Sequence, residues 1–253
     1  MALLRVDVIS KALDMATSFM AVLPDEGDLH KTRVVYLLHG LTDNCTGWTR
    51  YTSCERYARE HGVALIMPEV QRSFYIDGVY GLKYFTYVSQ ELPQMVHRMF
   101  GLPLEKEYSY IMGLSMGGYG ALKCALTHPE RYAGCGSFSG VTDLEEMRQH
   151  PTGSMQPWEY DALLGSGNRA GAENDLFRLA EKQNLPPIYL SCGEQDSLYP
   201  MNVRFAAHLE QLGATHRFDH RPGDHSWDFW DQSLQDCMNW LKLRKNPGRL
   251  DRP

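Results

Sequence analysis

Residues 108–127 read YSYIMGLSMGGYGALKCALT, in which an apolar run is followed by glycines around a serine and then by a segment rich in alanine and leucine. The run at 108–112 predicts a buried strand, and the segment 119–127, which stops before a His-Pro pair, predicts a helix. The pentapeptide Gly113-Leu114-Ser115-Met116-Gly117 matches G-x-S-x-G, whose serine occupies a strained turn from a strand into a helix. A glycine-rich turn with an incidental serine is the alternative, but the flanking strand and helix favour a nucleophile.

Strands and helices alternate along the rest of the chain. Alternating apolar positions at 3–23 predict two antiparallel strands that open the sheet. Further strands are predicted at 34–38, 64–68, 135–138, 188–192 and 216–220, and further helices at 48–60, 85–100 and 226–243. This order predicts an α/β fold with a mostly parallel central sheet flanked by helices.

The chain of 253 residues has the length of one large domain, and we expect a single domain over residues 1–253. Residues 141–182 differ from the rest because they are polar and rich in glycine around 165–167. We interpret them as a small cap-like insertion over the carboxyl edge of the sheet, where the active face is expected.

The composition argues against several classes of function. A formal net charge of −6 leaves no basic patch for nucleic acid, and no run of eighteen apolar residues predicts a membrane span. The first residues lack the basic and apolar regions of a secretory signal, and the six cysteines have no paired spacing, which indicates reduced thiols. We therefore expect a cytoplasmic protein; a homo-oligomer is compatible with the sequence, which carries no interface signature.

A serine hydroxyl is a weak nucleophile until a base removes its proton. On a fold of this kind the acid and then the histidine follow the serine along the chain. The strand at 188–192 leads into the segment GEQD at 193–196, in which Asp196 is the predicted acid and Glu194 its competitor. His225 lies between the last strand and the last helix, where it can face both partners. We therefore predict catalytic roles for Ser115, Asp196 and His225.

The other histidines raise the question of a metal site. The spacing of His216, His220 and His225 is compatible with metal ligands, but no cysteine or carboxylate set of a recognised type accompanies them. We predict that the protein uses no metal and no cofactor.

Acyl transfer places negative charge on the former carbonyl oxygen, which two backbone N–H groups stabilise. Met116, the residue after the serine, supplies one of them. We assign the other to Leu41, in the loop after the strand at 34–38, because Gly40 lets the backbone turn there. His39 is an alternative base, but its place at a strand end favours a role in bracing this loop by hydrogen bonds.

Aromatic residues are frequent in the loops expected around the active face, where they either line a pocket or pack between the loops and the sheet. We place Trp48 and Trp227 beside the pocket. The other candidates are Tyr75, Tyr84, Phe85 and Trp158.

Several segments together resemble the esterase D group of α/β-hydrolases, and especially the short bacterial carboxylesterases called tributyrin esterases. The resemblance extends over residues 5–243. Its landmarks are LLHG at 37–40, RSFY at 72–75, YVSQELP at 87–93, GLSMGGYGAL at 113–122, HPERY at 128–132 and CGEQD at 192–196.

The resemblance implies an eight-stranded α/β-hydrolase fold and hydrolysis of short acyl esters of small molecules. It carries the catalytic roles over to Ser115, Asp196 and His225, and the oxyanion donors to Leu41 and Met116. The wider group also contains feruloyl esterases, acetyl-sugar esterases, S-formylglutathione hydrolases and acyltransferases. These activities, and a non-catalytic binding module, are the alternatives to a serine carboxylesterase.

Overall fold

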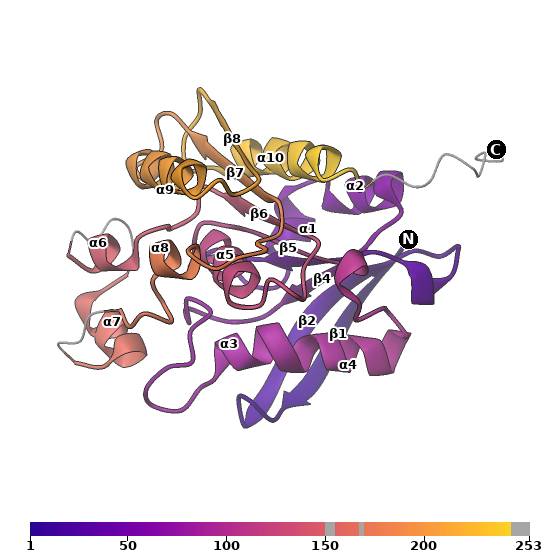
Figure 1. Ribbon diagram of the computed structural model, residues 1–253. Coiled ribbons are helices and arrows are strands. Elements are labelled where there is room, and N and C mark those ends of the chain that lie inside the picture. The colour runs from indigo at the N-terminus through magenta and orange to yellow at the C-terminus, as the bar shows by residue number, and fades with distance from the viewer. Residues whose placement is uncertain (150–154, 167–169, 244–253) are drawn as a thin grey trace.

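The computed structural model describes residues 1–149, 155–166 and 170–243 (Figure 1). Within these ranges eight strands form one sheet in the order β1-β2-β4-β3-β5-β6-β7-β8. The strands are β1 (Ala2–Ser10), β2 (Met15–Leu23), β3 (Val34–Leu38), β4 (Ala64–Pro68), β5 (Ser109–Leu114), β6 (Gly134–Phe138), β7 (Ile188–Gly193) and β8 (His216–Arg221). β1 and β2 pair antiparallel with each other, β2 pairs antiparallel with β4, and all other pairs are parallel. The predicted mostly parallel sheet is confirmed.

Helices follow most of the parallel strands and cover both faces of the sheet (Figure 1). They are α1 (Gly47–Tyr51), α2 (Cys54–His61), α3 (Tyr84–Thr86), α4 (Leu92–Phe100), α5 (Met116–Thr127), α6 (Leu144–Gln149), α7 (Pro157–Leu164), α8 (Leu176–Leu179), α9 (Tyr199–Gln211) and α10 (Trp227–Trp240). A π-helical turn, η2 (Tyr87–Glu91), joins α3 to α4, and short 3-10 turns lie at η1 (Leu29–Lys31) and η3 (Lys106–Tyr108). None of the helices in the described ranges is both long and apolar enough to cross a bilayer.

The side chains of the central strands alternate between two cores. In β3, Val34, Tyr36 and Leu38 face the core that contains α4, α5 and α9, whereas Val35 and Leu37 face the core that contains α2 and α10. Since all five residues of β3 are buried, the strand is apolar throughout, as expected for a strand covered on both faces.

The segment 48–60, expected to form one helix, is divided between α1 and α2. At the division, the Ser53 N–H donates to Oδ1 of Asp231 at 2.8 Å, and the Thr52 hydroxyl donates to the Trp48 carbonyl. A local pattern cannot predict this division, because the acceptor Asp231 lies in α10, near the other end of the chain.

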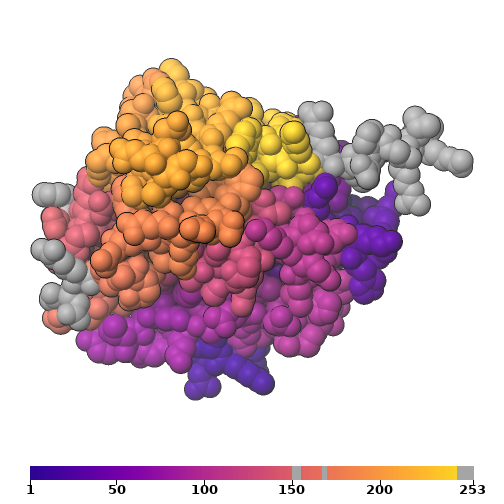
Figure 2. All heavy atoms as spheres, viewed as in Figure 1, coloured from indigo at the N-terminus to yellow at the C-terminus, as the bar shows by residue number. Residues whose placement is uncertain are grey.

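Segments distant in sequence lie side by side in the folded chain. Figure 2 shows the described C-terminal part of the chain, residues 188–243, in orange and yellow, packed over the magenta segments from the middle of the chain. The loops after β7 and β8 thereby come close to the loop after β5, where Ser115 lies.

Ile66 and Ile9 offer a test of this layered arrangement. Ile66 in β4 has no exposed surface, whereas Ile9 in β1 is 77% exposed. We expect Ile66→Ala to lower the free energy of unfolding by about 2–5 kcal/mol, because it removes buried methyl groups and leaves a cavity. Ile9→Ala, the same substitution at an exposed position, is expected to change it by less than about 0.5 kcal/mol. Denaturant unfolding measures both, and equal losses would contradict the burial assigned to β4.

Candidate active site

Ser115 lies at the sharp turn between β5 and α5, and its backbone is strained, as expected from its sequence context. Its φ of 52° and ψ of −118° lie in a region that residues with a side chain rarely adopt. Glycines make the turn possible: a Cβ at Gly113 would lie 2.3 Å from the Gly117 carbonyl oxygen, and one at Gly117 would lie 2.4 Å from the Leu38 carbonyl oxygen. The serine is therefore held above the sheet at the N-terminal end of α5, whose dipole favours negative charge.

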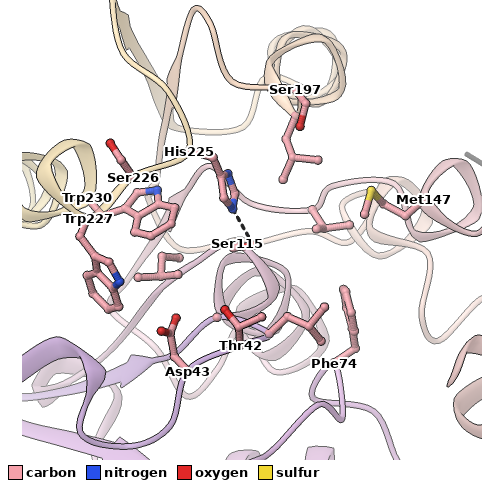
Figure 3. A pocket seen from close by; sticks show the side chains of 15 residues that line it. Thr42, Asp43, Phe74, Ser115, Met147, Ser197, His225, Ser226, Trp227 and Trp230 are labelled. Carbon is pink, nitrogen blue, oxygen red and sulfur yellow. Dashed lines mark hydrogen bonds between the residues drawn. The ribbon is translucent and has the colours of Figure 1, made fainter. Parts of the chain in front are cut away.

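His225 lies between Ser115 and Asp196. Its Nε2 is 3.1 Å from the Ser115 Oγ, and its Nδ1 is 2.8 Å from Oδ2 of Asp196 (Figure 3). With the aspartate ionised, Nδ1–H donates to the carboxylate, which leaves Nε2 free to accept the serine proton. The structure brings these three predicted residues together from the loops after β5, β7 and β8.

The Asp196 side chain is fully buried but well partnered. Its second oxygen, Oδ1, accepts a hydrogen bond from the Leu198 N–H at 2.9 Å. Burial raises the pKa of Asp196, but the hydrogen bond and charge of His225 and the Leu198 N–H outweigh it and hold the pKa below its ordinary value. The carboxylate therefore remains negative beside the imidazole. Glu194, the competing acid, instead pairs with His220 at the surface, 2.9 Å from its Nδ1.

The two predicted oxyanion donors flank the serine. Met116 begins α5, and Leu41 lies in the loop after β3 that also lines the cavity in front of Ser115. In the described part of the chain, neither backbone N–H has a hydrogen-bond acceptor. Both groups are thus available to a ligand.

The loop that carries Leu41 is held by His39, which fits the role predicted for that residue. The His39 ring is buried; its Nδ1 donates to the Gly40 carbonyl at 2.7 Å, and its Nε2 accepts from the Val70 N–H at 3.2 Å. Burial lowers the pKa of His39, whereas the hydrogen bond to the Gly40 backbone and the charge of Glu69 act to raise it. A neutral ring is required here, because a protonated Nε2 has no lone pair for the Val70 N–H. The ring thereby fixes the peptide group that contains the Leu41 N–H.

Tyr75 reinforces the same loop, a role that its sequence context did not reveal. Its phenol O–H donates to the His39 carbonyl at 3.0 Å, and its ring is fully buried rather than part of a pocket. Phe74 and Tyr75 both have positive φ values, 49° and 54°, which is uncommon for bulky residues. The Lys123 ammonium group donates to the Tyr75 carbonyl at 3.4 Å. The α5 helix therefore helps to hold this strained segment in place.

A cavity of about 400 Å³ opens in front of Ser115 and His225. This volume lies in the usual range of small-molecule sites. Trp227 lines the cavity, as predicted, but Trp48 does not. The Trp48 ring is fully buried, donates its Nε1–H to the Leu38 carbonyl at 3.0 Å, and packs edge-on beneath Trp227 with centroids 5.4 Å apart. The prediction that Trp48 borders the pocket is therefore corrected, because it supports the lining from one layer below.

His216 and His220, the other two histidines considered as metal ligands, hydrogen-bond to partners outside the active site. His216 Nδ1 contacts the Ala214 carbonyl at 3.0 Å, and His220 pairs with Glu194. The described ranges contain no cluster of three or more His, Cys, Asp or Glu side chains suited to a metal ion.

A serine at a strand-to-helix turn above a mostly parallel sheet defines the α/β-hydrolase class. The chain matches the family model described as putative esterase over residues 10–241, and it belongs to this Esterase family. An acetyl esterase of Caldicellulosiruptor saccharolyticus is 27% identical over an alignment that covers 95% of this chain and 98% of the relative.

Two solved structures from Staphylococcus aureus are also similar. FphF, a fluorophosphonate-binding serine hydrolase in a substrate-bound form, is 31% identical with a TM-score of 0.88, covering 96% of this chain and 99% of that chain. The S-formylglutathione hydrolase FrmB is 31% identical with a TM-score of 0.83, covering 95% of this chain and 98% of that chain. The protein is therefore a serine esterase of the α/β-hydrolase type, a carboxylic ester hydrolase, as its sequence predicted.

Tyr75→Phe tests the brace of the oxyanion loop. We expect kcat for an acetyl ester to fall about tenfold with KM changed less than about threefold, because the loop loses its phenol donor and the Leu41 N–H is less well aimed. Tyr119→Phe is the matched control, since its phenol donates to the Asn174 carbonyl at 2.9 Å, away from this loop. Steady-state kinetics and thermal unfolding of both variants separate the effects. We expect the two variants to lose a similar amount of stability, and kcat to fall only in Tyr75→Phe. An equal fall in kcat in both variants would contradict the proposed bracing role of Tyr75.

Proposed function

We propose that the enzyme hydrolyses short acyl esters through a covalent acyl-enzyme on Ser115, with His225 as base and Asp196 as the acid that orients it. The single observation that carries this proposal is the position of the His225 ring, whose nitrogens lie 3.1 Å from the Ser115 Oγ and 2.8 Å from the Asp196 carboxylate. Such a geometry allows one imidazole to accept a proton and to be stabilised once charged.

In the first half-reaction His225 Nε2 accepts the hydroxyl proton while Oγ forms a bond to the ester carbonyl carbon. The carbonyl oxygen becomes an oxyanion, which accepts hydrogen bonds from the N–H groups of Leu41 and Met116; each such donor is worth about 3 kcal/mol of barrier. The intermediate then collapses, the bond to the alcohol oxygen breaks, and His225 gives its proton to the departing alcohol.

In the second half-reaction water takes the place of the alcohol. His225 removes a proton from the water, whose oxygen attacks the acyl-enzyme, and the same two N–H groups stabilise the second oxyanion. Collapse releases the carboxylic acid and returns the proton to Ser115. All proton transfers use the one imidazole, and the balance of the reaction requires no redox or metal cofactor.

The lining of the cavity supports a small acyl group. Next to Ser115 it contains apolar side chains from four loops or helices: Phe74, Val141, Met147 and Leu198. Apolar side chains accept a hydrocarbon acyl chain, and the similarity to an acetyl esterase supports acetate as the first acyl group to test. Val141 and Met147 belong to the segment 141–182, of which residues 150–154 and 167–169 lie outside the described ranges. We further propose that the described parts of this segment act as a small cap over the site.

Hydrolysis of S-formylglutathione is the second candidate, and the similarity to FrmB favours it. The same serine chemistry cleaves a thioester, with the thiol in place of the alcohol. Comparison of kcat/KM for S-formylglutathione and for an acetyl oxyester, on one preparation, separates the two candidates.

We also propose a cytoplasmic location. The six cysteines are all buried free thiols, which supports a reducing compartment.

Asp196→Asn and Glu194→Gln form a matched pair that tests the assignment of the acid. We expect Asp196→Asn to lower kcat by roughly 10³–10⁴-fold, because the amide cannot stabilise the imidazolium or select the Nδ1–H tautomer. Glu194→Gln removes a carboxylate two residues away that pairs with the exposed His220 and not with His225, so kcat is expected to stay within about twofold. Hydrolysis of 4-nitrophenyl acetate measures both variants.

Ser115→Ala is expected to abolish turnover and covalent labelling by a fluorophosphonate probe while the unfolding midpoint is retained. Retained turnover in this variant, or labelling of another residue in the wild-type enzyme, would refute the assignment of the nucleophile.

A further inference from the structure

A second cavity lies outside the active site, between α7 and the loop that leads into α3 (Figure 1). Its volume is about 430 Å³, close to that of the cavity in front of Ser115, and the two share none of the described residues that line them. Ser73 lines the second cavity, whereas the next residue, Phe74, lines the first. The two cavities therefore adjoin across one segment of the chain, and the proposed mechanism makes no use of the second.

Exposed aromatic side chains lie at the mouth of this cavity. Trp158 of α7 is 67% exposed and Tyr80 is 77% exposed, and within the described ranges neither ring contacts another ring or a cation. Leu82 lines the same cavity and Val79 is its neighbour in the chain; both are also exposed. Large apolar side chains that gather around a hollow mark an interaction site, and the two rings offer free faces to a flat ligand.

The inner part of the cavity is apolar as well. It is lined by the buried side chains of Ile76 and Tyr84 and, from α7, by Ala162 and Leu163. The cavity thus has the usual composition of a small-molecule site, in which apolar and aromatic walls surround a small number of polar groups.

The charges in the lining neutralise each other. Arg72 and Glu159 are the charged residues among the described lining, and Arg72 donates from Nε to Oε1 of Glu159 at 2.5 Å and from Nη2 to Oε2 at 2.9 Å. The hydrogen bond from Arg72 holds the pKa of Glu159 below its ordinary value. Because each charge already has its counterion, a charged ligand would lose its hydration here without gaining a partner.

Ser73 supplies a polar group with remaining hydrogen-bond capacity. Its side chain is buried, and its oxygen accepts from the Tyr75 N–H at 3.2 Å. In the part of the chain that the structure describes, the hydroxyl proton has no acceptor. A hydroxyl can donate while it accepts, so this proton is available to an oxygen atom of a ligand.

We propose that this cavity is an accessory binding site for an uncharged aromatic molecule that carries a hydrogen-bond acceptor, such as an aryl ketone. The aromatic ring of the ligand packs against Tyr80 and Trp158, and its oxygen accepts from the Ser73 hydroxyl. The ligand is not a substrate in this position, because Ser115 and His225 line the other cavity.

The test uses 2-acetylnaphthalene as the probe and 2-ethylnaphthalene as its analogue without an acceptor. Binding is measured by equilibrium dialysis, before and after diisopropyl fluorophosphate has filled the active-site cavity and mass spectrometry has confirmed the adduct. We expect the treated enzyme to retain one binding site for 2-acetylnaphthalene. In Ser73→Ala the affinity for 2-acetylnaphthalene is expected to fall at least about threefold, and that for 2-ethylnaphthalene to stay within about twofold, because only the ketone loses a hydrogen bond.

Exposed residues provide variants that leave the core intact. Trp158→Ala is expected to weaken binding of 2-acetylnaphthalene by the treated enzyme at least about tenfold, because it removes an aromatic face. Leu82→Ala and Leu212→Ala form a matched pair, since the two leucines are 43% and 42% exposed and only Leu82 lines this cavity. We expect Leu82→Ala to weaken binding about threefold and Leu212→Ala to leave it unchanged.

Several results would overturn the accessory site. They are loss of binding after the fluorophosphate treatment, unchanged affinity in Trp158→Ala and Leu82→Ala, and tighter binding of the anion 2-naphthoate than of 2-acetylnaphthalene. Self-association of the enzyme that is abolished by Trp158→Ala, without binding of either naphthalene, would assign the aromatic surface to a second copy of the chain and overturn it as well.

Discussion

The close approach of α5 to the ends of β3 and β5 is the constraint on which the site depends. Main-chain atoms of Gly113, Gly117 and Leu38 approach one another so closely that a Cβ at either glycine has no room. This contact holds Ser115 at a φ of 52°, a conformation that costs about 1–3 kcal/mol. The buried packing of α5 offsets that cost. The hydroxyl therefore stands at the sheet edge, where the loops after β3, β7 and β8 meet.

The two sides of the site are held by different interactions. On the acid side, the buried carboxylate of Asp196 orients His225, whose side chain is 36% exposed. The second oxygen of this carboxylate accepts a hydrogen bond from the Leu198 N–H. On the oxyanion side, the neutral ring of His39 and the phenol of Tyr75 hold the loop before Leu41. Strained residues at 74 and 75 persist because the surrounding core fixes them. Together these contacts leave the catalytic groups preorganised and the cavity open to a small ester.

The sequence analysis misplaced Trp48 and missed the role of Tyr75 for the same physical reason, which is that both positions depend on contacts with distant segments. The sequence favours Trp48 as a pocket residue because of its position near the active face, but in the structure Trp227 lines the cavity and covers the fully buried Trp48. Likewise the motif that contains Tyr75, RSFY at 72–75, does not reveal that its phenol braces the oxyanion loop, because this role follows from the His39 carbonyl that lies opposite it after folding. Long-range partners of this kind leave no periodicity in the local sequence, so pattern analysis cannot find them.

Local patterns were sufficient for the succession of strands and helices along the chain, the class of fold and the choice of the three proposed catalytic residues. Continuous apolar runs identify strands buried on both faces, and the glycines around Ser115 identify a turn that few other residues can form. Tertiary structure alone showed that Asp196 pairs with His225 while Glu194 pairs with His220, divided the segment 48–60 into two helices, and placed Trp227 rather than Trp48 on the cavity. The features that only the tertiary structure decided depend on contacts between segments far apart in the chain. The features that the sequence determined depend on the conformational preferences of neighbouring residues.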